Sequence, residues 1–147
     1  KRLFGLGETA GTRSDIAAGI YDREASARVY EHLARTAKDL LSAGMNVILD
    51  ATFLAASHRR LARQAAEACG VACVIVRTTA TQETLVERLQ QRVAADDASE
   101  AGIEVLNHQL ENNDPLDPAE RKTLLTVDTG AVIDAERIAK RIRELRY

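Results

Sequence analysis

The stretch that decides the fold is Met45-Asn46-Val47-Ile48-Leu49-Asp50-Ala51-Thr52, an apolar run that ends in an acid and a hydroxyl. Gly44 precedes it, at a position where a left-handed residue often ends a helix. A short run rich in branched residues is typical of a strand that is buried on both faces of a parallel sheet. We therefore predict a buried strand here, with Asp50 just past its carboxyl end.

Helical patterns alternate with further apolar runs on both sides of this stretch. Between Ala25 and Leu41 apolar residues recur every four positions, which predicts a helix of about five turns. A second helix is predicted near residues 57–69, and buried strands are predicted at 71–76 and 124–127. Polar residues suited to capping begin the remaining helices: Thr81, Ser99, Asp117 (followed by Pro118) and Asp134.

The predicted order of elements is α-β-α-β-α-α-β-α. Strands separated by helices need crossover connections, so the sheet should be parallel with helices on both of its faces. A chain of 147 residues is long enough to bury a core and suits one domain. We therefore expect a three-layer α/β/α fold formed by residues 1–147 as a single domain.

The composition excludes several classes of protein. Lys and Arg number 20 and Asp and Glu number 22, so no positive field draws the chain onto bulk nucleic acid. No apolar run approaches the ~20 residues that span a bilayer, and the start lacks a signal-peptide core. Cys69 and Cys73 are expected to be separate thiols, and the three histidines are too scattered for a zinc site. We expect a cytoplasmic protein without a membrane partner.

Ligands of parallel α/β sheets bind beyond the carboxyl ends of the strands. In this chain that rule selects Asp50-Ala51-Thr52, Arg77-Thr78-Thr79 and Asp128-Thr129. An acid just after a buried strand suits a phosphoryl-transfer site, where it orients Mg²⁺ through water or takes a proton from an attacking hydroxyl. The residues alone leave a second interpretation open, in which Asp50 simply caps the helix that follows.

Arginines supply the positive charge that a phosphate site needs. Arg88 and Arg92 are four residues apart on one predicted helix, so both project from the same side, and a break follows at Asp96-Asp97. Such a pair suits a lid that closes on a phosphate. The alternative is a solvated face whose arginines pair with nearby glutamates. Arg59 and its neighbour Arg60 are equally ambiguous.

The glycines near the start imitate a phosphate loop in residues 7–14. The spacing, the lysine and the preceding strand that such a loop requires are all missing. The same test rejects a dinucleotide-binding fingerprint at residues 5–10. No phosphate loop is therefore expected within the numbered chain.

Taken together, the motifs of the chain resemble the P-loop kinase-like ATPase domain that often follows an aminoglycoside-phosphotransferase-like domain. Polynucleotide kinases of bacteria and gluconate kinase are similar in the order of their motifs. The resemblance covers nearly the whole chain and rests on these residues: Gly19-Ile20-Tyr21, 27–30, Gly44, 47–54, Arg59, Leu85, Arg88, Leu89, Arg92, 97–99, Val105-Leu106, Gln109 and 127–129.

The resemblance implies a kinase that uses ATP and Mg²⁺. Asp50 would face the metal, through water, or the acceptor, while Arg88 and Arg92 would be catalytic lid arginines on the transferred group. Thr52 and Arg59 would bind the acceptor. Nucleotide binding would fall to Arg88, Asp128 and Thr129.

The departure from the family is at the start of the chain. Family members carry a first strand and a Walker A loop upstream, so we expect the chain numbered from Lys1 to begin past that loop and to be inactive by itself. The leading hypothesis is an ATP-dependent phosphotransferase acting on a hydroxyl of a small molecule or nucleotide, and the resemblance implies a fused aminoglycoside-phosphotransferase-like domain as its partner. The alternatives are a non-catalytic nucleotide-binding regulatory module and a structural remnant.

Overall fold

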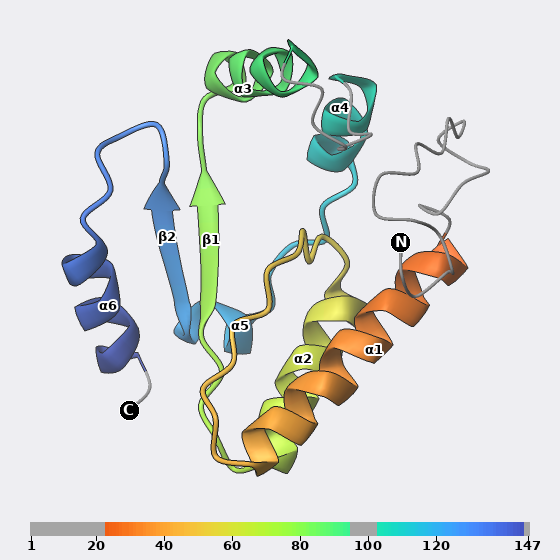
Figure 1. Cartoon of the computed structure of the whole chain (residues 1–147), viewed down its shortest axis with the longest axis vertical. Coiled ribbons are helices and arrows are strands. Elements are labelled where there is room, and N and C mark those ends of the chain that lie inside the picture. Colours follow the sequence, from red (N-terminus) through yellow and green to blue (C-terminus); the bar gives the residue numbers. More distant parts are fainter. Residues whose placement is uncertain (1–22, 95–102, 146–147) are drawn as a thin grey trace.

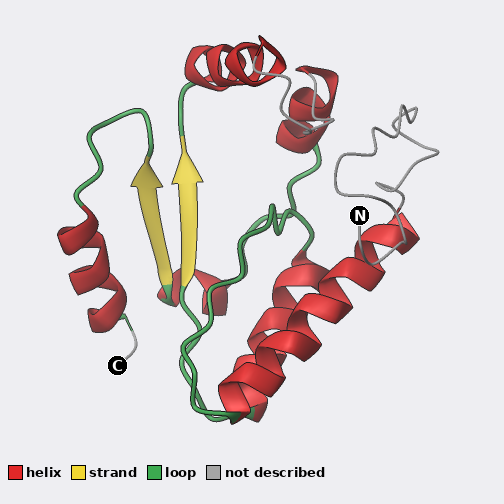
Figure 2. Cartoon of the chain, viewed as in Figure 1, coloured by secondary structure: helices red, strands yellow, loops and turns green. Residues whose placement is uncertain are grey.

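The computed structural model describes residues 23–94 and 103–145, which form helices around a small sheet (Figure 2). The described elements, in chain order, are α1 (Arg23–Ser42), α2 (Ala56–Ala68), β1 (Ile75–Thr79), α3 (Gln82–Ala94), α4 (Ile103–Glu111), α5 (Pro118–Lys122), β2 (Leu124–Asp128) and α6 (Ala135–Glu144).

The two strands are parallel, as the crossover argument predicted. Their register pairs Ile75 with Leu124 at one end and Thr79 with Asp128 at the other. Beyond the strands the amide of Thr129 donates to the carbonyl of Thr79 at 2.7 Å, which extends the pairing by one residue. Figure 1 shows α3 next to the carboxyl end of β1 and α6 alongside β2. The polar residues that follow both strands therefore lie at one edge.

The predicted strand at residues 47–49 is wrong for this structure. Residues 45–50 form no ladder with any described strand, and Ile48 and Met45 are 93% and 48% exposed. An apolar run becomes a buried strand only where neighbours supply hydrogen bonds and cover both faces. The strand predicted at residues 71–76 also differs from the structure. The observed strand begins at Ile75 instead of residue 71 and is mostly exposed. The described sheet therefore contains only β1 and β2.

The buried core of the described chain lies between α1 and α2. Ala37, Ala65 and Ala66 are among the most buried side chains, and their small size lets the two helix backbones approach closely. The two helices run in the same direction, since Ser42 and Cys69 meet at their carboxyl ends. Figure 1 shows this pair packed along its length. The pair supports the segment between the two helices, which contains the loop of residues 50–54.

The residues that begin or end most of the described helices were predicted correctly. Gly44 and Gly70 have φ values of 80° and 64°, the left-handed backbone expected where α1 and α2 end. Asp117 closes a capping box at the start of α5, with Pro118 as the first helical residue. Caps at Thr81 and Asp134 are also confirmed by bonds to backbone amides of α3 and α6. The predicted cap Ser99, the break at 96–97 and the glycine-rich segment lie outside the described residues.

Helices with a small parallel sheet place the chain in the α/β class. The three-layer arrangement and the single domain over residues 1–147 stay predictions. None of the described helices has the length and apolar character needed to cross a membrane.

Candidate functional site

The first cluster of predicted site residues lies at the carboxyl edge of the sheet. From α3, Nη1 of Arg88 donates to Oγ1 of Thr129 at 2.9 Å, and Nη2 donates to the Thr129 carbonyl at 2.6 Å. The Thr129 hydroxyl in turn donates to the Thr79 carbonyl at 2.9 Å. The structure thus brings together two of the residues predicted to bind nucleotide. Arg92 also lies on α3, but its side chain is outside the described part of the structure.

Asp128 ends β2 at the same edge and is exposed. Its Oδ1 accepts a hydrogen bond from the amide of Gly130 at 2.8 Å, and a Cβ at position 130 would lie 3.2 Å from this oxygen. Glycine therefore allows the loop to turn tightly around the carboxylate. Asp128 and Thr129 present a carboxylate and a hydroxyl beside the Arg88 guanidinium.

The second cluster is the loop of residues 50–54, which connects the exposed apolar run to α2. Asp50 is exposed, and no hydrogen bond or ion pair joins its side chain to another described residue. It does not cap α2. The N-cap of that helix is Ala55, and Oδ2 of Asp114 accepts from the Ala56 amide at 2.8 Å. The capping interpretation of Asp50 is wrong, and within the described residues its carboxylate has no bonding partner.

Phe53 has a strained backbone within this loop. Its φ of 48° lies in the left-handed region, which a bulky residue occupies at a cost of about 1–3 kcal/mol. Hydrogen bonds hold it there from both sides. Its amide donates to the hydroxyl of Tyr30 at 3.1 Å, and its carbonyl accepts from Nη1 of Arg59 at 3.0 Å. Such strain persists only where the surroundings fix it, and it gathers at functional sites.

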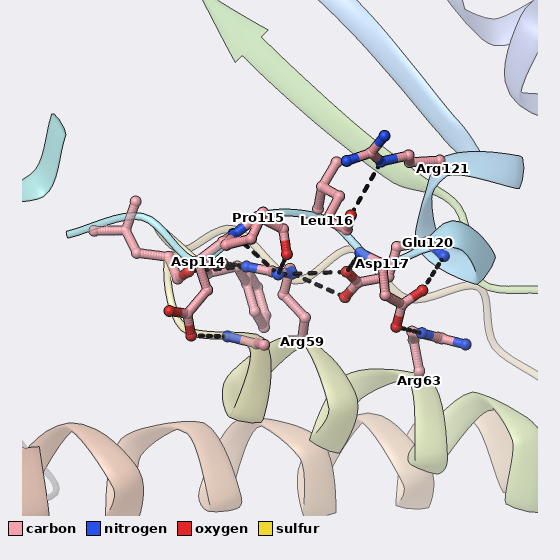
Figure 3. Close-up of polar contacts among 11 residues, drawn as sticks. Arg59, Arg63, Asp114, Pro115, Leu116, Asp117, Glu120 and Arg121 are labelled. Atoms are coloured by element: carbon pink, nitrogen blue, oxygen red, sulfur yellow. Dashed lines mark hydrogen bonds and ion pairs between the residues drawn. The ribbon is translucent and has the colours of Figure 1, made fainter. Parts of the chain in front are cut away.

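Arg59 is the buried centre of this cluster, with only 5% of its surface exposed (Figure 3). Its guanidinium has five N–H groups, and all find acceptors within the chain. The acceptors are the backbone carbonyls of Phe53, Leu54, Asp114 and Pro115 and both carboxylate oxygens of Glu120. In this arrangement Arg59 organises the loop and has no donor left over for an acceptor molecule.

Glu120 on α5 is the ionic partner of Arg59, at 2.8 Å and with 3% exposure. Burial raises the pKa of Glu120, but hydrogen bonds from Arg59 and from the Asp117 amide, together with the Arg59 charge, outweigh burial and leave the pKa below its ordinary value. The amide of Glu120 donates to Asp117 at 2.7 Å, which completes the capping box. The carboxylate thus ties α5 to the loop before α2.

Acid should loosen this junction. The pKa of Glu120 is lowered by folding, so its contribution to stability is present above the unfolded-state pKa and is lost as the pH falls through the folded-state pKa. We expect the urea midpoint to fall as the pH drops from about 5 towards 3. Urea unfolding of the wild type and of Glu120→Gln across this range measures the effect. The variant should be weaker at neutral pH and lose less in acid, and parallel pH profiles would refute this role.

Asp50 is the residue that was predicted to face a magnesium ion through water. Among the described side chains no three His, Cys, Asp or Glu residues come together as a metal cluster. Mg²⁺ keeps several waters and is usually held by one or two carboxylates together with phosphate oxygens. The exposed carboxylate of Asp50 has the donor chemistry that such a hydrated ion requires.

Sequence reasoning missed several residues that shape the site. Glu120 stands three positions after Asp117, a spacing that signals a capping box, although nothing local indicated its bond to Arg59. Tyr30 lies on the apolar side of a predicted helix and within the 27–30 motif of the resemblance, but neither signal indicated its bonds to the loop. Asp114 supplies the cap that Asp50 was considered for. His58 stacks on Tyr30 with ring centroids 3.8 Å apart, and its pKa is lowered by burial despite the nearby Asp114 charge.

The fold and the two clusters define a parallel α/β domain in which Arg88 of α3 bonds to Thr129 just past β2, while the exposed carboxylate of Asp50 lies on a loop and bonds to no other described residue. Residues 1–116 match the family model of the AAA domain, so the chain belongs to that family. The family is P-loop kinase-like, which supports nucleotide binding.

The chain is also similar to uncharacterized proteins of Mycobacterium bovis and Mycobacterium tuberculosis. Each is 31% identical over 103 residues, which make up 70% of this chain and 21% of the relative. The matched region thus covers about a fifth of the length of these relatives. No solved structure matches the chain.

Proposed function

We propose that the chain is part of an ATP-dependent phosphotransferase that transfers the γ-phosphoryl group to a hydroxyl of a small molecule or nucleotide. One observation carries the proposal: the Asp50 carboxylate is exposed and bonds to no other described residue, on a loop that Arg59 holds in place. A group held this way can act on a reactant without first giving up a structural bond. Membership of a P-loop kinase-like family supports the choice of ATP.

In the proposed step the oxygen of the acceptor hydroxyl forms a bond to the γ-phosphorus. The bond from that phosphorus to the bridging oxygen breaks, and ADP leaves with the electron pair. The hydroxyl proton passes to the carboxylate of Asp50. Mg²⁺, when bound, would neutralise charge on the phosphate oxygens. Thr52, exposed two residues after Asp50, would contact the acceptor.

Arg88 would act on the transferred group. Its guanidinium is exposed and is held by two oxygens of Thr129, a neutral partner that phosphate oxygens can replace with stronger, charge-assisted bonds. Arg92, four residues later on α3, would share this task. Asp128 and Thr129 would then contact the nucleotide at the same edge.

The wider setting belongs to the same proposal. The mycobacterial relatives are far longer than the matched region, which supports a longer parent protein. Within the proposal, this parent carries a phosphate loop, completes a three-layer sheet and is attached to an aminoglycoside-phosphotransferase-like domain. We place the protein in the cytoplasm, because it would consume ATP and because Cys69 and Cys73 are both free thiols.

Replacing Arg88 tests this function. In the full-length protein, Arg88→Ala should lower Mg²⁺-ATP hydrolysis, with water as acceptor, by about 10- to 100-fold, since a donor to the developing charge is lost. The matched control is Arg141→Ala, which removes an exposed arginine of α6 that pairs with Glu144 at 2.6 Å. Release of ADP by both variants measures the effect.

Equal rates in the two variants would remove Arg88 from the reaction. A full-length protein that binds ATP by calorimetry and releases no ADP, with or without candidate hydroxyl acceptors, would favour the regulatory module. An absence of ATP binding would leave the structural remnant.

A further inference from the structure

Tyr30 of α1 reaches the loop of residues 50–54 with its polar end. Its ring is buried, with 9% exposure, and it stacks on His58 and meets the Phe53 ring edge-on at 5.0 Å. Both contacts fix the direction of the Cζ–O bond. The hydroxyl therefore stands at a defined point under the loop.

At that point the hydroxyl makes two bonds to adjacent residues. It accepts from the amide of Phe53 at 3.1 Å and lies 3.0 Å from Oγ1 of Thr52. Phe53 has the left-handed backbone, and Thr52 is the residue just before it. The phenolic oxygen thus holds the amide side of the turn between Asp50 and α2, while Arg59 holds the carbonyl side.

We infer that Tyr30 is a positioning residue of the phosphoryl-transfer site, which sets the direction of Asp50 and Thr52 through the turn at Phe53. The inference rests on the proposed function for its catalytic consequence. Its structural part stands on the two bonds alone. Without the hydroxyl, the turn keeps its bonds to Arg59 but loses those on its amide side, so the backbone at Thr52 and Phe53 becomes more mobile and Asp50 is less firmly directed.

The test uses Tyr30→Phe in the full-length protein, because phenylalanine keeps both ring contacts and deletes only the oxygen. The matched control is Ser42→Ala, which removes a hydroxyl from the other end of α1, where it bonds to Cys69. Amide hydrogen exchange of residues 50–56 should become about tenfold faster in Tyr30→Phe and stay unchanged in the control.

Mg²⁺-ATP hydrolysis supplies the catalytic readout. In Tyr30→Phe, kcat should fall by about 10- to 100-fold, because small misplacements of reacting groups have effects of this size. The Kd for ATP without Mg²⁺ should match that of the control, since the nucleotide edge is formed by other residues. A purely structural role would change thermal stability without this separation of kcat from binding.

Three results would contradict the inference in different ways. Unchanged exchange at residues 50–56 would show that the hydroxyl does not hold the loop, whatever the activity. Faster exchange with a kcat equal to that of Ser42→Ala would show that the loop does not position the reacting group, while leaving phosphoryl transfer intact. A wild type that releases no ADP would overturn the proposed function itself and the catalytic role of Tyr30 with it.

Discussion

Replacing Arg59 with methionine is expected to destabilise the protein by about 3–5 kcal/mol. The change leaves the Glu120 carboxylate buried without its cation, and it removes the donor from four backbone carbonyls of the loop and of the segment before α5. Buried groups without partners lose their solvation without compensation. Methionine fills a similar volume, so the loss reports the bonds more than a cavity.

The matched control lies one turn later on the same helix. Arg63 pairs with Asp117 of the α5 cap at 3.1 Å, but the two side chains are 36% and 52% exposed. Arg63→Met should therefore cost at most about 1 kcal/mol. Urea unfolding of both variants gives the comparison. If the two losses are alike, the buried network around Arg59 does not hold this junction.

Local chemistry predicted the parts of the fold that depend on a few neighbouring residues. Thr81 and Asp134 cap helices because their side chains accept hydrogen bonds from backbone amides three residues later. Asp117-Pro118 starts α5 for the same reason, with a proline that needs no amide partner. The parallel pairing of β1 and β2 followed from the helices between them.

The parts that failed depend on residues far apart in the chain. Residues 45–50 have the composition of a buried strand, yet burial requires neighbours that composition does not supply. Arg59 seemed equally suited to an acceptor and to a structural role. Its partner Glu120 lies 61 residues away, and only the folded chain shows that the two meet.

The roles predicted for the site residues stay predictions, although the structure brings two of those residues together. The rule of strand ends selected Asp128 and Thr129, and the structure places Arg88 beside them. The rule of strand ends did not reveal the strained turn at Phe53, because the hydroxyl of Tyr30, on the preceding helix, fixes the Phe53 backbone. The role predicted for Arg92 stays a prediction, because its side chain lies outside the described part of the structure.

Asp50→Asn is expected to reduce phosphoryl transfer by about 10²- to 10⁴-fold, the range for losing a general base. Asparagine has nearly the same shape and cannot take the hydroxyl proton. Because the Asp50 side chain is exposed and makes no bond to another described residue, thermal stability should stay within about 0.5 kcal/mol of the wild type. A large kinetic effect without a change in stability is the pattern expected of a group that acts on the reactants.

Release of ADP from Mg²⁺-ATP by the full-length protein, compared between the wild type and Asp50→Asn, tests the central claim most directly. Asp39→Asn, which changes an exposed acid of α1 in the same way, is the matched control. We predict ADP release by the wild type and by Asp39→Asn at similar rates, and at least a hundredfold slower release by Asp50→Asn. Equal rates in all three proteins would contradict the assignment of Asp50 as the carboxylate that accepts the proton in a phosphoryl-transfer site.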